Sequence, residues 1–147
     1  MEEQDLIREA LQARKYSYSP YSGYQVGAAL LSAEGKVYTG CNIENAAYSP
    51  TNCAERTAFF KAVSEGVYKF KKIAVVGSPK GEVNQFAFPC GVCRQVMMEF
   101  CDPQDFEIIV AKSTTEYKVF YLKDLLTEGF GPGNLARWEN SNENTLL

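Results

Sequence analysis

The fold is decided by residues 73–110, which read IAVVGSPKGEVNQFAFPCGVCRQVMMEFCDPQDFEIIV. Two apolar runs, at residues 72–77 and 106–111, have the length and composition of buried strands. Between them, residues 91–100 repeat apolar side chains at helical spacing, namely Val92, Val96, Met97 and Phe100. A strand, a helix and a strand in this order predict a parallel pair of strands joined by a right-handed crossover.

The residues on either side of this unit predict three further strands. Residues 24–31 and 36–41 are joined by the turn Ser32-Ala33-Glu34-Gly35, which is typical of a hairpin. Residues 117–121 predict an edge strand. Helical patterns cover residues 2–15, 53–65 and, briefly, 122–126. The sequence therefore predicts an α/β fold, a three-layer α/β/α sandwich with a mixed five-stranded sheet and helices on both faces.

The chain of 147 residues favours one domain, which we expect to span residues 1–137. Residues 138–147 are polar and predict a surface tail. The N-terminus is acidic, unlike a secretory signal, and no apolar run is long enough to span a bilayer. We therefore expect a cytoplasmic protein with no membrane contact. A net charge of −3 argues against a nucleic-acid partner, because binding nucleic acid requires a basic face.

The sequence contains no histidine. This excludes a Ser-His-Asp or Cys-His nucleophile and an HExxH protease site. It also excludes a zinc site with imidazole ligands, so thiolates and carboxylates must hold any metal. The five cysteines are an odd number in a chain expected in a reducing compartment, which favours metal binding or catalysis over disulfides.

Three of the cysteines lie in two short segments, Cys53-Ala54-Glu55-Arg56 and Pro89-Cys90-Gly91-Val92-Cys93. A C-x-x-C pair alone is also compatible with a redox motif, half of a structural zinc site, or chance. Three thiolates around Zn²⁺ leave the fourth tetrahedral position to water, as in a catalytic site, whereas a fourth thiolate gives a structural site. Cys101 lies about 15 Å along the predicted helix and is too distant, but Cys41 stays a candidate. We favour a small buried apolar role for both.

Both cysteine segments open predicted helices, whose N-termini favour thiolates. Three thiolates and Zn²⁺ carry a net charge of −1, which weakens the metal as a Lewis acid. Arg56 or Arg94 offsets this charge if it donates hydrogen bonds to sulfur, and we favour Arg56. Each arginine is otherwise an ordinary solvated helix charge. Glu55, two residues after Cys53, is the natural proton carrier in a site without imidazole.

The signature of zinc-dependent nucleobase deaminases is H-x-E followed by P-C-x-x-C, with an all-cysteine variant. Residues 53–55 and 89–93 match that variant. Over residues 16–133 the chain resembles the small, all-cysteine members of the cytidine and deoxycytidylate deaminase family. The other segments that carry the likeness are YSGYQVGAA at 21–29, GCNIENA at 40–46 and FGP at 130–132.

The resemblance implies the composition of the metal centre. Cys53, Cys90 and Cys93 would hold one Zn²⁺ per chain, Glu55 would carry protons, and Arg56 would donate hydrogen bonds to the thiolates. The resemblance also implies a small nucleoside substrate and a homotetramer whose active sites are shared across subunits.

The resemblance further implies contacts with the substrate. Asn42 and Glu44 would bind the ribose 3′-hydroxyl, a role that suits their acceptor-rich side chains, although asparagine is also a common turn former. The Ala54 N–H would bind the 2-carbonyl of the pyrimidine, and Tyr24 would lie beside the base. Phe130 would reach across a subunit boundary to stack on the base.

Two positions depart from the family pattern. Tyr24 stands where phenylalanine is usual and adds a hydroxyl to the pocket wall. Phe88 stands where a small polar residue usually precedes the proline, and its backbone carbonyl would still receive the leaving amine. We expect the nearby Tyr16, Tyr18 and Tyr21 in the core or an interface rather than on the base.

The sequence therefore predicts a zinc-dependent hydrolase of pyrimidine salvage that converts cytidine and 2′-deoxycytidine to uridine and 2′-deoxyuridine plus ammonia. Glu55 would carry one proton from water to N3 and a second to the amino group. One alternative is a deaminase of a related aminopyrimidine nucleoside. Another is a non-enzymatic domain with a structural zinc, which needs a fourth protein ligand. The short chain without a basic stripe disfavours a polynucleotide editor.

Overall fold

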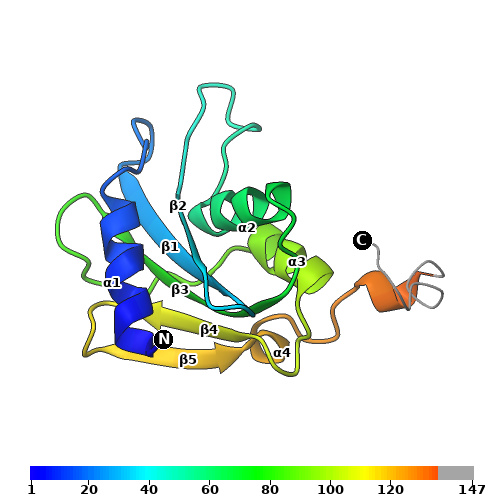
Figure 1. Cartoon of the computed structure of the whole chain (residues 1–147). Helices are drawn as coiled ribbons and strands as arrows, with labels where there is room; N and C mark the ends of the chain where they lie inside the picture. Colours follow the sequence, from blue (N-terminus) through cyan, green and yellow to red (C-terminus); the bar gives the residue numbers. More distant parts are fainter. Residues whose placement is uncertain (136–147) are drawn as a thin grey trace.

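The structure is a computed structural model that describes residues 1–135 (Figure 1). Its sheet has five strands in the order β2-β1-β3-β4-β5. The strands are β1 (Tyr24–Ser32), β2 (Val37–Cys41), β3 (Phe70–Pro79), β4 (Glu107–Ala111) and β5 (Tyr117–Tyr121). The predicted surface tail, residues 138–147, lies outside the described residues, as do residues 136 and 137 of the predicted domain.

The sheet contains one parallel pair of strands, and it is the pair that the sequence predicts. β3 and β4 run in parallel, with Ile73 opposite Ile108 and Val75 opposite Val110. The pairings of β1 with β2, β1 with β3 and β4 with β5 are antiparallel. The predicted mixed sheet is therefore confirmed, and β5 lies at its edge as expected.

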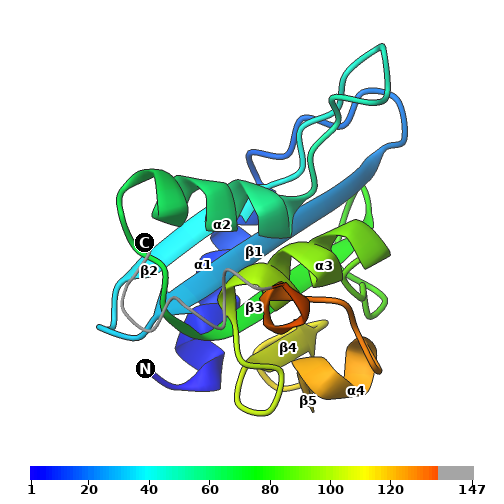
Figure 2. The ribbon, with the colours of Figure 1, turned by 90° about the vertical axis from the view of Figure 1, so that its right-hand side faces the viewer.

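Helices cover both faces of the sheet (Figures 1 and 2). α1 (Glu3–Arg14) lies on one face, and α2 (Ala54–Ser64) and α3 (Gly91–Phe100) lie on the other. The predicted three-layer α/β/α sandwich is confirmed. Two short segments follow β5, namely α4 (Leu122–Leu125) and a 3-10 turn at Pro132–Asn134. No helix among the described residues is both long and apolar enough to cross a membrane.

A hydrophobic core lies on each side of the sheet because side chains alternate between its faces. On the α1 side, the buried residues are Leu6, Ile7, Ala10, Ala29, Leu31, Ala74, Val76, Ile109 and Ala111. On the other side, a larger cluster surrounds Phe59 of α2. The Phe59 ring centroid lies 5.0 Å from that of Phe70 and 6.1 Å from those of Phe100 and Phe106. These contacts fix α2 and α3 on the sheet.

Two glycines let helices approach the sheet closely. A Cβ on Gly40 of β2 would lie 2.4 Å from the Ala54 carbonyl oxygen and 2.7 Å from the Ala58 nitrogen, both in α2. A Cβ on Gly27 of β1 would lie 2.1 Å from the Ala10 carbonyl oxygen in α1. Any larger residue at either position would have to move a helix backbone, so these glycines set the distance of each helix from the sheet.

The main difference from the sequence prediction is the length of β3, which spans Phe70–Pro79 rather than residues 72–77. The additional residues include lysine, serine and proline, so they carry no apolar pattern. Their backbone nevertheless pairs with β1, from Phe70 opposite Ser32 to Pro79 opposite Tyr24. The extension brings the end of β3 beside the first residue of β1, at the edge of the pocket described next.

Candidate active site

Three cysteine side chains converge where α2 and α3 begin. Cys53 is the N-cap residue of α2, Cys90 is the N-cap residue of α3, and Cys93 lies in the first turn of α3. Their sulfurs all lie within 4.8 Å of one another. Neither cap residue gives a side-chain hydrogen bond to its helix. The two helix N-termini instead favour negative charge on the grouped sulfurs.

The three sulfurs fit a tetrahedral Zn²⁺. Zn–S bonds of about 2.3 Å in tetrahedral geometry separate two sulfurs by about 3.8 Å. The Sγ atoms of Cys53 and Cys90 are 3.6 Å apart. Within residues 1–135, the group of candidate ligands contains Cys53, Cys90 and Cys93 and no fourth residue. Three protein ligands are typical of catalytic zinc sites, in which water or substrate supplies the fourth ligand.

The other two cysteines lie outside this group. Cys41 ends β2 and is half-buried, and Cys101 directly follows α3 and packs against the core around Phe59. Burial raises the pKa of both thiols above the usual value, so both favour the neutral form. The structure confirms that Cys101 is remote from the metal group, and Cys41 does not join it either.

Arg56 occupies the position predicted for offsetting the thiolate charge. Its Nη2 donates to the Cys53 sulfur over 3.3 Å. Although burial lowers it, hydrogen bonds with Cys53 and Cys93 raise the pKa of Arg56 above its ordinary value. The Arg56 Nε atom is buried and has no hydrogen-bond partner among the described residues. Arg94 points elsewhere, because its Nε and Nη1 each donate over 2.8 Å to the carbonyls of Pro89 and Leu125.

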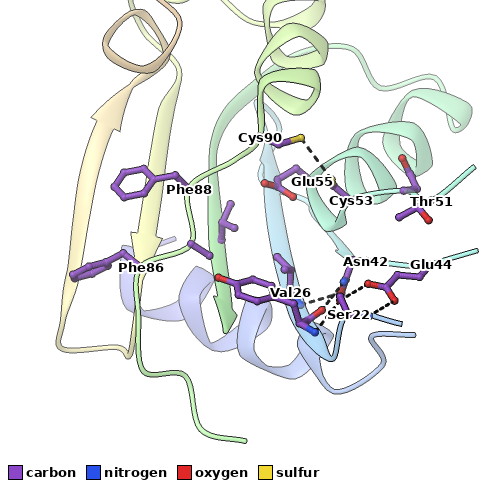
Figure 3. Close-up of a pocket in the computed structure, with 14 residues that line it drawn as sticks. Ser22, Val26, Asn42, Glu44, Thr51, Cys53, Glu55, Phe86, Phe88 and Cys90 are labelled. Atoms are coloured by element: carbon purple, nitrogen blue, oxygen red, sulfur yellow. Dashed lines mark hydrogen bonds between the residues drawn. The ribbon is translucent and has the colours of Figure 1, made fainter. Parts of the chain in front are cut away.

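The Glu55 carboxyl group lies beside the cysteines (Figure 3). The residue is 4% exposed, and burial raises its pKa to about 7. Hydrogen bonding with Cys93 lowers the pKa of Cys53 to about 5, and the charge on Cys53 contributes to the raised pKa of Glu55. A carboxyl group with a pKa near neutrality accepts and releases protons readily. The arrangement therefore suits proton transfer next to a metal centre.

A pocket of about 350 Å³ lies against the metal group and Glu55. This volume is in the range of sites for small molecules. The predicted site residues that line it are Tyr24, Asn42, Glu44, Cys53, Glu55 and Cys90. The other lining residues are Ser22, Val26, Thr51, Asn52, Val75, Phe86, Ala87 and Phe88 (Figure 3). The pocket therefore combines an apolar wall with a small number of polar groups.

Asn42 is held firmly at one side of this pocket. The residue is 9% exposed. Its Oδ1 accepts hydrogen bonds from the Val26 N–H (2.9 Å) and the Ser17 hydroxyl (2.5 Å), and its Nδ2 donates to the Tyr24 carbonyl (2.8 Å). These contacts fix the orientation of the amide. They direct Oδ1 toward the protein and leave one Nδ2 hydrogen as a donor.

Comparison with known proteins identifies the family of this chain. Residues 1–108 match the family described as the cytidine and deoxycytidylate deaminase zinc-binding region. The chain belongs to this family. The cytidine deaminase of Halalkalibacterium halodurans is 49% identical over 130 residues, which cover 88% of this chain and 95% of that protein. The cytidine deaminase of Sporosarcina psychrophila is 59% identical over 102 residues, which cover 69% and 72%.

Solved structures of cytidine deaminases share the fold. The crystal structure of the Burkholderia pseudomallei enzyme has a TM-score of 0.78 and 44% identity, covering 88% of this chain and 100% of that chain. The Mycobacterium tuberculosis structure has a TM-score of 0.74 and 36% identity, covering 89% and 98%. The three-thiolate group thus lies in a cytidine deaminase fold, and it fits one Zn²⁺ per chain.

Two phenylalanines line one wall of the deaminase pocket, and sequence reasoning identified Phe88 but missed Phe86. The Phe86 ring centroid lies 4.8 Å from Lys112 Nζ and 4.6 Å from Lys118 Nζ. The Phe88 ring centroid lies 5.5 Å from that of Phe120 in β5. These contacts attach the loop before α3 to the edge of the sheet. The Phe-Ala-Phe sequence before Pro89 was the only local signal, because the rest of the loop follows no periodic pattern.

The hydroxyl that distinguishes Tyr24 from the usual deaminase phenylalanine has a partner. It donates to Gln85 Oε1 over 2.7 Å. Gln85 belongs to the same loop as Phe86 and Phe88, so this bond ties the loop to the beginning of β1. Nothing in the sequence indicated Gln85, because the contact joins residues 61 positions apart.

Some predicted residues do not line this pocket. Ala54 is fully buried as the first residue of α2. Phe130 is 59% exposed, and its carbonyl accepts a hydrogen bond from Gln95 Nε2 over 2.8 Å. The tyrosines expected in the core or an interface, Tyr16, Tyr18 and Tyr21, are exposed in the chain, so the core interpretation is wrong for them. They lie on or before the loop that contacts the segment after β2.

Proposed function

We propose that the protein is a hydrolase that converts cytidine and 2′-deoxycytidine to uridine and 2′-deoxyuridine with release of ammonia. The observation that carries this proposal is the buried carboxyl group of Glu55 beside three zinc-binding thiolates in a pocket of about 350 Å³. The similarity to proteins named cytidine deaminase supports the same reaction. We place the activity in pyrimidine salvage in the cytoplasm.

The chemistry divides between the metal and Glu55. Zn²⁺ held by Cys53, Cys90 and Cys93 would lower the pKa of a water molecule and make it a nucleophile at neutral pH. Glu55 accepts a proton from this water and donates it to N3 of the pyrimidine, which makes C4 electrophilic. Once the water oxygen has added to C4, Glu55 takes the remaining proton from that oxygen and donates it to the amino group. The C4–N bond then breaks, ammonia leaves, and the added oxygen becomes the C4 carbonyl. Arg56 donates to the Cys53 sulfur and offsets the negative charge of the thiolates.

The nucleoside is bound by groups on three sides of the pocket. We propose that the Nδ2 hydrogen of Asn42 and the carboxylate of Glu44 bind the ribose 3′-hydroxyl. Tyr24 lies beside the pyrimidine, the Ala54 N–H binds its 2-carbonyl, and the Phe88 carbonyl receives the leaving amine. The position of Ala54 at the first turn of α2 supports its role, because such N–H groups have no partner within the helix.

We further propose that four chains form a homotetramer in which Phe130 of one subunit stacks on the base bound by another. Two observations support this arrangement. Phe130 is 59% exposed and does not line the pocket of its own chain. The pocket borders exposed aromatic residues, including Tyr21 and Tyr48, whose ring centroids are 6.2 Å apart. A second subunit would cover this apolar surface.

The decisive experiment measures the loss of cytidine absorbance together with zinc per chain. We expect one zinc per chain and turnover of cytidine and 2′-deoxycytidine. The free base and the 5′-monophosphate should react much more slowly, because the pocket provides sugar-hydroxyl contacts but its lining includes no arginine or lysine. A zinc-loaded protein with no turnover of any cytosine compound would contradict the proposal and favour a structural zinc. Preference for a modified nucleoside would favour the related aminopyrimidine alternative.

A further inference from the structure

One serine side chain connects the parts of the pocket that we assign to the ribose. Ser22 is adjacent to Gly23, in the loop that precedes β1, and it lines the pocket. Its hydroxyl donates to Glu44 Oε2, and its Oγ accepts a hydrogen bond from the Tyr24 N–H over 3.0 Å. The Tyr24 carbonyl in turn accepts from Asn42 Nδ2 over 2.8 Å. The backbone of Tyr24 therefore links Asn42, which bonds its carbonyl, to Ser22, which bonds its N–H and also contacts Glu44. Figure 3 shows Ser22, Asn42 and Glu44 at this side of the pocket.

Ser22 also holds the Glu44 carboxylate through two hydrogen bonds, one from its N–H and one from its hydroxyl. Glu44 Oε1 accepts from the backbone N–H groups of Tyr21 (2.9 Å) and Ser22 (3.1 Å), while the Ser22 hydroxyl occupies Oε2. These hydrogen bonds, with the Ser22 hydroxyl first, lower the pKa of Glu44 below its usual value. A glutamate is ionised at neutral pH even without these bonds, and an ionised carboxylate can only accept hydrogen bonds.

These contacts decide which hydrogen-bonding groups Asn42 and Glu44 can offer to a substrate. Asn42 offers a hydrogen, since its Oδ1 is already used by Val26 and Ser17. Glu44 offers only lone pairs. A sugar hydroxyl satisfies both at once, because it accepts from Asn42 and donates to Glu44. A substituent that lacks either function leaves one of these groups without its partner.

We propose that Ser22 is a positioning residue that orients Glu44 toward the ribose 3′-hydroxyl and couples it to Asn42. This inference rests on the proposed function. Ser22 acts through Glu44 on the sugar and takes no part in the chemistry at C4. Its loss should therefore weaken the binding of substrates with a 3′-hydroxyl, and should leave the rate of the bound substrate nearly unchanged.

The test compares Ser22→Ala with the wild type on cytidine and on 3′-deoxycytidine. With cytidine, we expect KM to rise about tenfold and kcat to change less than twofold. With 3′-deoxycytidine, which lacks the hydroxyl, the variant and the wild type should have KM values within about twofold. A merely structural role would weaken both substrates equally, and that result would overturn the proposal.

The chain offers a matched control in the same loop. The Ser19 hydroxyl contacts Ser17 and no pocket residue, so Ser19→Ala should leave both KM values unchanged. Ser22→Thr retains the hydroxyl and should restore most of the affinity for cytidine. Zinc content and thermal unfolding of each variant show whether it is folded.

A second arm tests whether Ser22 acts through Glu44. In a Glu44→Gln background, the carboxylate that Ser22 orients is already absent. The conversion of Ser22 to threonine or alanine in that background should then change KM for cytidine by less than about twofold. A further tenfold rise would overturn the proposal. Failure of the proposed function would look different, because the wild type itself would not deaminate cytidine.

Discussion

At the scale of single residues, the site concentrates its chemistry in two charged side chains from the first turn of one helix. Glu55 is buried and is the proton carrier that we propose, and Arg56 donates to the Cys53 sulfur. A site with an imidazole in place of one thiolate carries less negative charge on the metal. This chain has no histidine, and we propose that Arg56 offsets the charge of the three thiolates while Glu55 moves the protons.

Replacement of Glu55 by glutamine tests the proton carrier. Glutamine has nearly the same shape but cannot accept the proton from water at neutral pH. We expect Glu55→Gln to lower kcat by a factor of about 10²–10⁴ while zinc stays bound. Steady-state assays on zinc-quantified protein measure this. Near-normal turnover with full zinc would show that another group moves the protons.

Replacement of Arg56 by alanine tests the charge balance. The variant loses the hydrogen bond to the Cys53 sulfur but keeps the three thiolates. We expect Arg56→Ala to retain zinc and to lose about 10- to 100-fold in kcat, the usual effect of removing a partner of a metal ligand. Arg94→Ala is the control, because its guanidinium contacts backbone carbonyls instead. An unchanged rate in Arg56→Ala would show that the charge needs no compensation.

At the scale of elements, the site depends on how closely α2 lies against the sheet. Gly40 allows this approach for α2, and Gly27 allows the equivalent approach for α1 on the other face. The two glycines therefore provide a comparison between a helix that carries metal ligands and one that carries none. The same substitution can be made at both glycines, so a difference in its effect comes from the helix that each glycine contacts.

We expect Gly40→Ala and Gly27→Ala each to lower the free energy of unfolding by about 3 kcal/mol or more, since a methyl group would overlap helix backbone. Only Gly40→Ala should also reduce zinc affinity and kcat, because it displaces Cys53 and Glu55. Chemical denaturation and zinc titration measure both effects. Equal loss of zinc affinity in the two variants would show that zinc binding depends only on the overall stability of the fold, and not on the position of α2.

The elements themselves were largely predictable from the sequence. Apolar runs such as residues 106–111 and helical repeats such as residues 91–100 carry strong sequence signals. The structure has the predicted strand and the predicted helix at these positions. The end of β3 was not predictable, because Ser78 and Pro79 lie opposite residues of β1 but carry no apolar pattern. The cysteines and Glu55 were identified from motif spacing. Ser22 and Gln85 were missed, because their roles depend on contacts across loops.

At the scale of the whole molecule, the proposed tetramer can be tested by mixing inactive chains. Glu55→Gln lacks the proton carrier, and Phe130→Ala lacks the ring that we assign to the neighbouring site. Tetramers assembled from both variants would contain some sites with a wild-type Glu55 and a partner's wild-type Phe130. We expect co-refolded mixtures to exceed the summed activity of the separate variants. Light scattering should give four times the mass of one chain, and simple additivity would argue against shared sites.

The metal should also stabilise the fold. Cys53 and Cys90 are 37 positions apart, and a link between them removes freedom from the unfolded chain worth about 4 kcal/mol in the simplest model. We expect a strong chelator to lower the melting temperature by roughly 10 °C or more, and added Zn²⁺ to restore it. Scanning calorimetry before and after chelation measures the shift. An unchanged melting temperature after complete zinc removal would show that core packing alone holds α2 and α3.

The joining of α2 and α3 through one ion has a consequence for a living cell. A chain that has not acquired its metal would open more often at these two helices, and proteases degrade chains in proportion to how often they open. The amount of the protein would then follow the supply of zinc, in addition to its activity per molecule. Zinc starvation would lower cytidine deamination in two ways, through fewer protein molecules and through a smaller share of molecules that hold zinc.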